Sequence, residues 1–147
     1  MILETSIKTM KVSDAMTHNP IVVNQNTPLT EVQDIFEKEM IHHIPVVDDA
    51  DFLMGIISKS DLNLLLDWGT KLNLKSSQIK NDKLLSSNTA DSICSPHVMA
   101  VRPEDSLVYC FEIFRENYFR SLPVVDDEGK IVGIITPYDL MVAAFTK

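Results

Sequence analysis

The hydrophobic positions follow the same order twice along the chain, and each time they predict the same elements. Apolar residues at helical spacing predict one amphipathic helix in each half: Leu29, Val32, Ile35, Phe36 and Met40, then Leu107, Cys110, Phe111, Phe114 and Tyr118. Two short runs rich in branched residues follow each helix and predict a hairpin: Ile44–Val47 with Leu53–Ser58, then Leu122–Val125 with Ile131–Thr136.

Polar and turn residues predict where the remaining elements begin. A short helix and a small apolar strand are expected before each amphipathic helix: Val12–Met16 and Pro20–Val23, then Ala90–Cys94 and Val98–Val101. Thr27 and Ser106 stand at the two helix starts, where a side-chain oxygen can cap unpaired N–H groups. Gly129 suits a turn with positive φ. A second helix is expected to begin at Lys59 in one half and at Pro137 in the other.

The two halves are copies of one unit, because equivalent residues lie 78 positions apart with no gap. Between Val12/Ala90 and Leu62/Leu140, 14 of 51 positions are identical, including the Pro-Val-Val-Asp-Asp run and the Gly-Ile-Ile run. The expected fold is α/β (α+β type), with two β-α-β-β-α repeats packed as a pseudo-twofold pair. The expected boundaries are 10–67 for the first repeat, 68–88 for a linker with a helix extension, and 89–146 for the second repeat.

The segment between the repeats begins with an apolar stretch. Leu64–Leu66 and Trp68 continue the helix that starts at Lys59, and they pack either within the chain or against a second copy. Ser76–Ser77 and Ser86–Thr89 are interpreted as linker.

Composition narrows the class of protein. The chain has 147 residues, and its 45% hydrophobic residues are typical of a globular domain. Its formal net charge of −8 disfavours binding to nucleic acid or to an anionic membrane. No apolar run has the length of a membrane span or a signal peptide, so we expect a cytoplasmic protein. Cys94 and Cys110 form no Cys-x-x-Cys pair and are interpreted as small apolar residues, with a disulfide or redox role as the alternative.

Features of an enzyme or a metal site are missing from the sequence. There is no nucleophile motif or glycine-rich phosphate loop, and the chain has four glycines. Asp48–Asp49 and Asp126–Asp127 are paired carboxylates, but both pairs fall in turns, where aspartate commonly bonds its own backbone. His42 and His43 are adjacent, so on a strand they face opposite ways. We expect neither catalysis nor a metal site.

The repeated Ile/Leu-Pro-Val-Val-Asp-Asp turn and the repeated Gly-Ile-Ile-Ser/Thr-x-x-Asp-Leu segment resemble a tandem pair of CBS domains, the regulatory module named after cystathionine β-synthase. The resemblance covers residues 10–67 and 88–145. It implies two equivalent clefts between the paired domains, where many members bind adenine nucleotides or related adenosyl compounds.

The resemblance also implies roles for particular residues. Asp61 and Asp139 match the aspartate that accepts hydrogen bonds from ribose hydroxyls, with Ser58 and Thr136 beside them, and the alternative is that all four only cap helix starts. Adenine is expected against the first strand of a repeat and the residues before Val-Val: Thr17, Asn19, Pro20 and Ile21 with Ile44 and Pro45 in the first copy, and Ser95, His97 and Val98 with Leu122 and Pro123 in the second.

Phosphate groups require cations, and the candidates are His42 and His43, the equivalent Arg120 and Ser121, and also Lys59 and Arg102. The alternative for each cation is a solvated surface charge. Because Ser121 replaces His43, the two sites are not expected to be equal.

The sequence therefore predicts a regulatory, nucleotide-sensing module with no obligatory cofactor. The regulatory ligand is an adenine nucleotide (AMP, ADP or ATP), with S-adenosylmethionine or NAD(H) as further possibilities. A homodimer is expected through the helices Lys59–Trp68 and Pro137–Phe145. Because nothing is fused to the pair, an unknown effector protein would receive the signal. The alternative is a ligand-free structural dimerisation or scaffold domain.

Overall fold

The computed structural model describes residues 7–70, 74–96 and 98–146, and within the helices it describes only the backbone of 68–70 and 74–80. The chain folds into two compact units. The central unit is Ile21–His97, and the terminal unit combines Met1–Pro20 with Val98–Lys147.

The central unit is built on a three-stranded sheet of order β2-β3-β4. Strand β2 is parallel to β3, and β3 forms an antiparallel hairpin with β4. The elements in chain order are β2 (Val23–Asn24), α3 (Leu29–Lys38), β3 (His43–Val47), β4 (Leu53–Ser58), α4 (Lys59–Thr70), α5 (Leu74–Ser87) and the 3-10 turn η1 (Ala90–Ser92).

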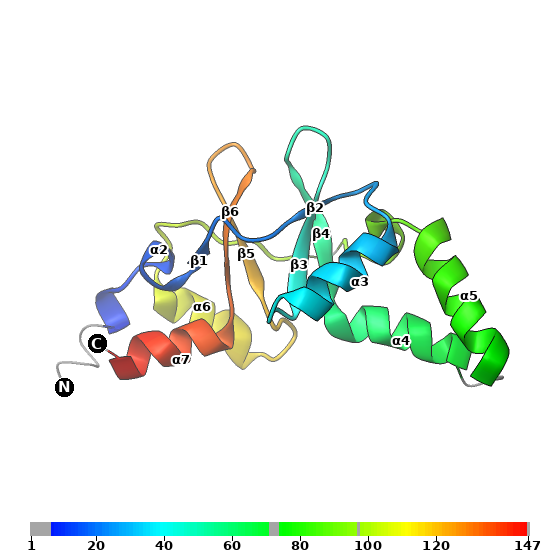
Figure 1. Cartoon of the computed structure of the whole chain (residues 1–147). Helices are drawn as coiled ribbons and strands as arrows, with labels where there is room; N and C mark the ends of the chain where they lie inside the picture. The colour runs from blue at the N-terminus through cyan, green and yellow to red at the C-terminus, as the bar shows by residue number, and fades with distance from the viewer. Residues whose placement is uncertain (1–6, 71–73, 97, 147) are drawn as a thin grey trace. The chain divides into compact units, whose positions relative to one another are not determined.

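The terminal unit has a sheet of order β1-β6-β5, and both strand pairs are antiparallel. Figure 1 shows β1 beside β6, although the two strands come from opposite ends of the chain. The elements in chain order are α2 (Val12–Ala15), β1 (Thr17–His18), α6 (Leu107–Arg115), β5 (Leu122–Val125), β6 (Ile131–Ile135) and α7 (Pro137–Thr146).

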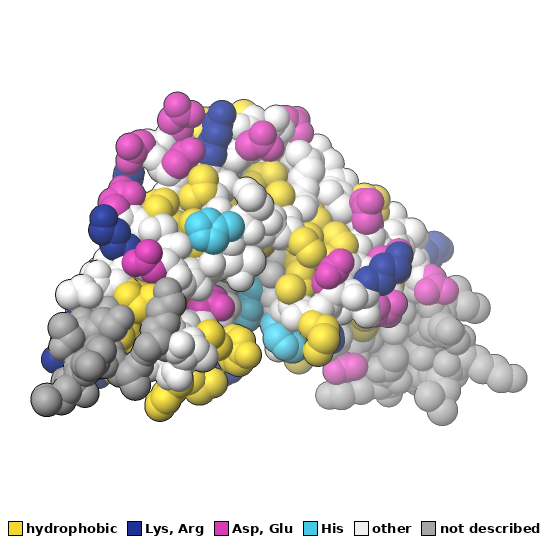
Figure 2. Space-filling model, turned by 60° about the vertical axis from the view of Figure 1, so that its left-hand side comes forward, with side chains coloured by type: hydrophobic (Ala, Val, Ile, Leu, Met, Phe, Trp, Pro, Cys, Tyr) yellow, Lys and Arg dark blue, Asp and Glu magenta, His cyan; other side chains and the backbone are white. Residues whose placement is uncertain are grey.

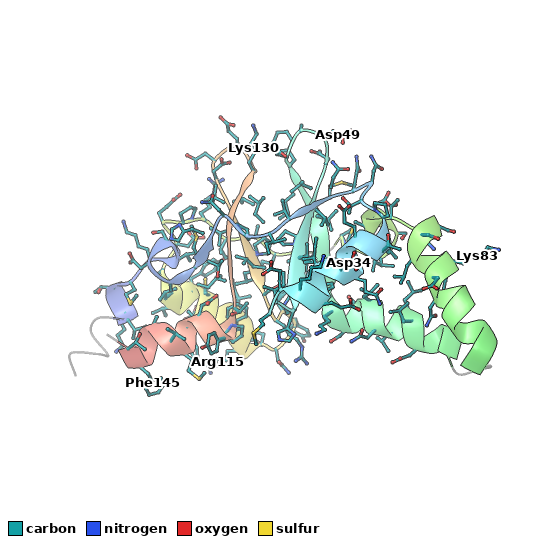
Figure 3. The ribbon with its side chains drawn as sticks, in the orientation of Figure 1. Asp34, Asp49, Lys83, Arg115, Lys130 and Phe145 are labelled. Atoms are coloured by element: carbon teal, nitrogen blue, oxygen red, sulfur yellow. The ribbon has the colours of Figure 1, made fainter. Side chains whose placement is uncertain are left out.

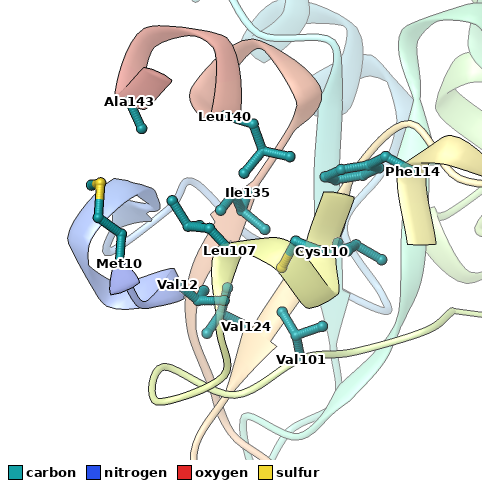
Figure 4. Close-up of a cluster of buried hydrophobic side chains, with 11 residues drawn as sticks. Met10, Val12, Val101, Leu107, Cys110, Phe114, Val124, Ile135, Leu140 and Ala143 are labelled. Carbon is teal, nitrogen blue, oxygen red and sulfur yellow. The ribbon is translucent and has the colours of Figure 1, made fainter. Parts of the chain in front are cut away.

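Each unit combines a three-stranded sheet with helices around its own hydrophobic core, and this architecture confirms the mixed α/β expectation. In the terminal unit α6, α7 and α2 place apolar side chains on one face of the sheet, where Leu107, Val124 and Ile135 are buried (Figure 4). In the central unit the corresponding core joins α3, α4 and α5 to the sheet through Leu29, Ile44, Ile57, Leu62 and Leu85.

The first segment of each repeat joins the sheet of the other repeat. Thr17 in β1 pairs with Ile134 in β6, and Ser95 forms an antiparallel bridge with Ile56 in β4. These two pairings are equivalent under the 78-residue offset, so the duplication extends to tertiary contacts. The compact units consequently divide the chain differently from the sequence repeats.

Several local expectations were wrong. The strands expected at 20–23 and 98–101 are replaced by the short strands β1 and β2 and by a single bridge at Val101. Met40 is fully exposed and Tyr118 is largely exposed, because α3 ends at Lys38 and α6 ends at Arg115 before either residue is reached.

The expected linker also proved to be partly helical. Ser76–Ser77 lies within α5, which packs against α3 and α4 and buries Leu85. The Asn88 side chain donates a hydrogen bond to the Leu84 carbonyl at 2.8 Å and helps to end this helix. Tertiary packing stabilises a helix whose polar sequence gives a weak periodic signal.

The paired aspartates have the turn role that the sequence suggested. Oδ1 of Asp48 accepts hydrogen bonds from the backbone N–H groups of Ala50 and Phe52, at 2.9 and 3.0 Å. Asp126 makes the equivalent pair of bonds with Glu128 and Lys130. Figure 3 places Asp49 and Lys130 at the tips of the two hairpins.

Gly55 and Gly133 occupy equivalent positions where another segment passes close to the strand. A Cβ at Gly55 would lie 2.4 Å from the Ser95 carbonyl oxygen, and one at Gly133 would lie 2.5 Å from Sδ of Met16. We predict that Gly55→Ala lowers the free energy of unfolding by about 1–3 kcal/mol, as overpacking does. Gly133→Ala should cost less, because its shortest contact is with a methionine end that can move, and the nearest backbone atom, the Thr17 carbonyl oxygen, lies farther away at 3.0 Å. Urea denaturation measures both.

The matched control is the double variant Gly133→Ala with Met16→Ala, which removes the methionine sulfur from the contact. Gly133→Ala should lower the free energy of unfolding less in a Met16→Ala background than in the parent protein. Equal losses at Gly55 and Gly133 would contradict the distinction between a backbone and a side-chain clash.

Candidate functional site

The turn from β6 into α7 holds a hydroxyl and a carboxylate in mutual contact. Asp139 Oδ2 accepts hydrogen bonds from the Thr136 backbone N–H at 2.9 Å and from the Thr136 hydroxyl at 3.2 Å. The Asp139 N–H points back to Thr136 Oγ1 at 3.4 Å. Within the described residues no hydrogen bond reaches Asp139 Oδ1, so this oxygen is available to a hydroxyl donor.

Burial affects the charge of this carboxyl group. Desolvation raises the pKa of Asp139 above its ordinary value, and the two hydrogen bonds from Thr136 partly oppose the shift. The charged form of Asp139 is therefore destabilised in the folded protein, and hydrogen bonds from a ligand would stabilise it.

The equivalent turn in the central unit is more open. The Asp61 N–H donates to Ser58 Oγ at 3.0 Å, and Asp61 is exposed. Both turns therefore have the hydroxyl–carboxylate spacing that the sequence predicted, but in the described structure only Thr136 also donates to its aspartate.

A row of residues crosses each sheet on the face away from the core. Leu122 and Ile135 are an opposed pair with no exposure and face the core. Alternation along the strands turns Pro123 and Ile134 to the other face, where Thr17 of β1 completes the row. In the central unit the equivalent row is Pro45, Ile56 and Ser95.

These rows correct the grouping of the expected adenine residues. Thr17, Asn19 and Pro20 belong to the unit of Pro123 and Asp139, and not to the unit of Ile44 and Pro45 with which the sequence grouped them. Ser95 likewise belongs with Asp61, and the unit boundaries assign Ile21 to the central unit and Val98 to the terminal unit.

Some candidate positions have other surroundings, and two residues were missed. Ile44 and Leu122 are fully buried in their cores and do not face the rows. Ile56 and Ile134 stand at the centre of the rows but were not selected, although the repeated Gly-Ile-Ile run contained them. Asn19 has a positive φ of 49° and donates its N–H to the Val132 carbonyl at 3.3 Å. His97 lies outside the described residues.

The candidate phosphate residues fall into two groups. His43 is in register with Ser58, and the Lys59 N–H donates to the His42 carbonyl at 2.8 Å, so these residues share one end of the central sheet. Arg120 and Ser121 precede β5 at the equivalent end of the terminal sheet.

Arg102 lies elsewhere, because it forms an ion pair with Asp127 of the hairpin turn. That turn is at the opposite end of β6 from Thr136, so the structure does not bring Arg102 to the carboxylate. Asn24 makes the equivalent contact with Asp49, donating a hydrogen bond at 3.0 Å. In this structure Arg102 therefore contacts the hairpin turn and not the hydroxyl–carboxylate turn.

The cysteines and potential metal ligands were also located. Cys94 and Cys110 are free thiols, and burial, with a smaller contribution from Asp105, raises the pKa of Cys110 to about 11. Among the described residues, His, Cys, Asp and Glu side chains form no group of three that could hold a metal ion. No described helix is long and apolar enough to cross a membrane.

The duplicated α/β unit, with a hydroxyl–carboxylate turn at each second helix, defines a protein built from two paired domains of one kind. A family model for the CBS domain matches residues 12–66 and 90–145. The chain belongs to the CBS domain family, as the repeated motifs predicted.

Known relatives share most of this chain. The uncharacterized protein MJ1426 of Methanocaldococcus jannaschii is 31% identical, and the match covers 91% of this chain and 90% of that protein. An inosine-5'-monophosphate dehydrogenase of Aquifex aeolicus is 32% identical, but the match to 91% of this chain spans only 24% of the enzyme.

Two solved structures of CBSX2 have the same fold. The structure of the Arabidopsis thaliana CBS-pair protein has 27% identity and a TM-score of 0.77, covering 92% of this chain and 94% of that one. A structure of CBSX2 in complex with AMP has 30% identity and a TM-score of 0.75, covering 92% of this chain and 96% of that one.

We predict that Asp139→Asn raises the stability of the ligand-free protein at neutral pH. The raised pKa of Asp139 means that folding favours the protonated form, so this group's contribution to stability is greatest in acid and is lost as pH rises through the folded-state pKa. Asparagine can still accept from Thr136 but carries no charge. Thermal midpoints measured from pH 4 to 8 should converge in acid.

The matched control is Asp34→Asn, which removes an exposed carboxylate from α3. A neutral-pH midpoint for Asp139→Asn at or below that of the parent protein would show that the charged aspartate stabilises α7.

Proposed function

We propose that this protein is a regulatory module that binds adenosine-containing ligands, with one ribose carboxylate in each unit, and that occupancy changes its interaction with another protein. The free carboxylate oxygen of Asp139, held beside Thr136, is the observation that carries this proposal. A carboxylate accepts two hydroxyl hydrogen bonds well, and bonds to an ionised acceptor are the stronger kind. Asp61 and Ser58 supply the equivalent groups in the central unit.

The rows of residues beside the turns suit a planar base. Thr17 is exposed and Ile134 is partly exposed, so they offer one hydroxyl and one apolar surface on a strand edge, while the β1 backbone lies next to them. Complex formation between CBSX2 and AMP supports an adenine nucleotide as the ligand. Ligand binding regulates a partner only if the ligand favours one arrangement of the protein over another.

A structural scaffold without ligand is the second candidate. It is supported by the exposed position of Asp61 and by the presence of aspartate at the start of a helix, where the carboxylate complements the helix dipole without any ligand.

We predict that one member of a panel of AMP, ADP, ATP, S-adenosylmethionine and NADH raises the melting temperature. A ligand at 100 times its dissociation constant stabilises the folded state by about 2.7 kcal/mol. The double variant with Asp61→Ala and Asp139→Ala should remain folded and lose this shift. Differential scanning fluorimetry measures both effects.

Asp34→Ala provides a control for loss of an exposed carboxylate. If no compound raises the melting temperature of the parent protein, the scaffold proposal is favoured. If the double variant responds like the parent, the ribose assignment fails even though the protein binds nucleotide.

We further propose that two copies associate through α7. Helix α7 exposes an apolar stripe at positions i, i+3, i+4 and i+7, made of Tyr138, Met141, Val142 and Phe145. Phe145 projects away from the sheet in Figure 3, and Figure 2 shows hydrophobic side chains gathered along the lower edge of the part that carries α7. The stripe has no charged side chain to repel an identical helix. The equivalent positions on α4 are Ser60, Asn63, Leu64 and Asp67, which are mostly polar.

We predict that Met141→Lys with Phe145→Lys converts a dimer into a folded monomer, because charges on the stripe oppose self-association. Light scattering coupled to size-exclusion chromatography measures the mass, and circular dichroism checks the fold. Ser60→Lys with Asn63→Lys on α4 is the matched control and should leave the dimer intact. A parent protein that is monomeric at high concentration would contradict the proposed association.

A further inference from the structure

Helix α5 covers part of the central unit and lies in the segment that joins the two sequence repeats. It packs against α3 and α4, and its Leu85 is 3% exposed within the core that these helices share with the sheet. In Figure 1 α5 folds back from the end of α4 toward the start of α3. The Leu29 N–H at the start of α3 bonds to the Asn88 carbonyl at 2.9 Å, so the chain just after α5 is fixed there.

The terminal unit shows which part of α5 a unit requires. Under the 78-residue offset Ile7 is equivalent to Leu85, and Ile7 also packs against the core of its own unit. The Leu107 N–H bonds to the Met10 carbonyl at 3.0 Å, which is the equivalent of the bond at the start of α3. Before α2, the described residues of the terminal unit contain a single helical turn, 7–9. The contacts common to both units therefore belong to the C-terminal end of α5, and its earlier turns have no described counterpart.

Several features weaken the hold of α5 on the central unit. Its 14 residues include four serines, which are poor helix formers in a helix interior. Leu85 is the one residue of α5 classed as buried among those whose side chains are described. Oδ1 of Asn81 is buried without a hydrogen-bond partner in the described structure. A buried acceptor without a partner lowers stability, so α5 is expected to open before α3 or α4 does.

The surface beneath α5 suits a basic amphipathic helix. The sequence of α3 contains three acidic residues and one lysine, whereas that of α5 contains three lysines and one aspartate. Opposite net charges on two packed helices favour their contact. Leu65 and Leu66 of α4 are partly buried and pack against the core that holds Leu85. An apolar surface beside an acidic helix is complementary to a helix with leucine on one face and lysine on another.

We propose that α5 is a removable cover over a helix-binding surface, meaning the faces of α3 and α4 that α5 contacts. A basic amphipathic helix of the effector protein displaces α5 from this surface. The displacing helix supplies an apolar side chain at the place of Leu85 and has no buried amide at the place of Asn81. The contacts at the C-terminal end of α5 keep the opened helix attached to the unit. The inference rests on the proposed interaction with another protein and does not depend on nucleotide binding.

Hydrogen–deuterium exchange of the full chain measures the opening of α5. The backbone amides of α5 should exchange at least about tenfold faster than those of α3 and α4. Asn81→Leu removes the unpaired oxygen and should slow exchange in α5 by about tenfold, with α3 unchanged. Ser86→Leu, at an exposed position of the same helix, is the matched control for helix propensity and should slow exchange by no more than about twofold. Equal exchange rates in α3, α4 and α5 would show that α5 is not removable.

A synthetic peptide of residues 74–88 that carries Asn81→Leu tests the helix-binding surface. Fluorescence anisotropy measures binding of the labelled peptide to the full chain. Leu85→Asp in the chain should release α5 and raise the affinity for the peptide by at least about tenfold. Asn81→Leu in the chain should lower that affinity by about tenfold, because the cover is then held more firmly. A peptide that also carries Leu85→Asp is the matched control and should not bind.

Equal peptide affinity for the parent chain and for its Asn81→Leu variant would overturn the inference, and this comparison does not require the Leu85 variant to fold. Failure of a folded Leu85→Asp chain to bind the peptide would also overturn it, with circular dichroism as the check on folding. The peptide and the nucleotide panel are separate measurements. A chain that responds to nucleotide but not to the peptide would retain the proposed ligand-binding function and lose the helix-binding surface.

Discussion

The close approach of a backbone segment to the middle of a strand is the contact on which each unit depends. Gly55 lies against Ser95, and Gly133 lies against Met16 and Thr17, because neither glycine has a Cβ to hold the segment away. The approach lets Thr17 pair with β6 and Ser95 bridge to β4. Each sheet thereby gains an edge from a distant part of the sequence, and the terminal unit is closed by both ends of the chain.

The candidate sites follow from this edge pairing. The added segment completes the row across the sheet. Strands β4 and β6 lead directly into the two hydroxyl–carboxylate turns. In the terminal unit the row Thr17, Ile134 and Pro123 therefore lies two residues along the strands from Thr136 and Ser121. Ile134, Pro123 and the carboxylate of Asp139 come from the second repeat, whereas Thr17 comes from the first repeat, so the complete row requires both.

Duplication preserved the backbone of this arrangement and allowed its side chains to diverge. The hairpin turns, the bridging pairs and the two glycines are equivalent in both units. The side chains beside the carboxylates and on the outer faces of α4 and α7 differ in charge and polarity. The backbone contacts constrain residues that must pack or turn, whereas the positions beside the carboxylates and on the outer helix faces are free to change. The two units therefore differ in charge and polarity where the fold does not restrict the side chain.

The sequence by itself determined the duplication, the hairpins, the starts of α4 and α7 and the aspartates of both turns. These features depend on local hydrophobic periodicity, on turn chemistry and on motifs that each occur within a few residues, such as Thr136 and Asp139. Tertiary structure decided which segments share a sheet: Thr17 with Pro123 rather than with Pro45, and Arg102 with a hairpin rather than with a carboxylate. It also decided that the polar α5 segment is a helix. Those outcomes depend on contacts between residues that are distant along the chain, and the periodicity of a single segment carries no information about its partner.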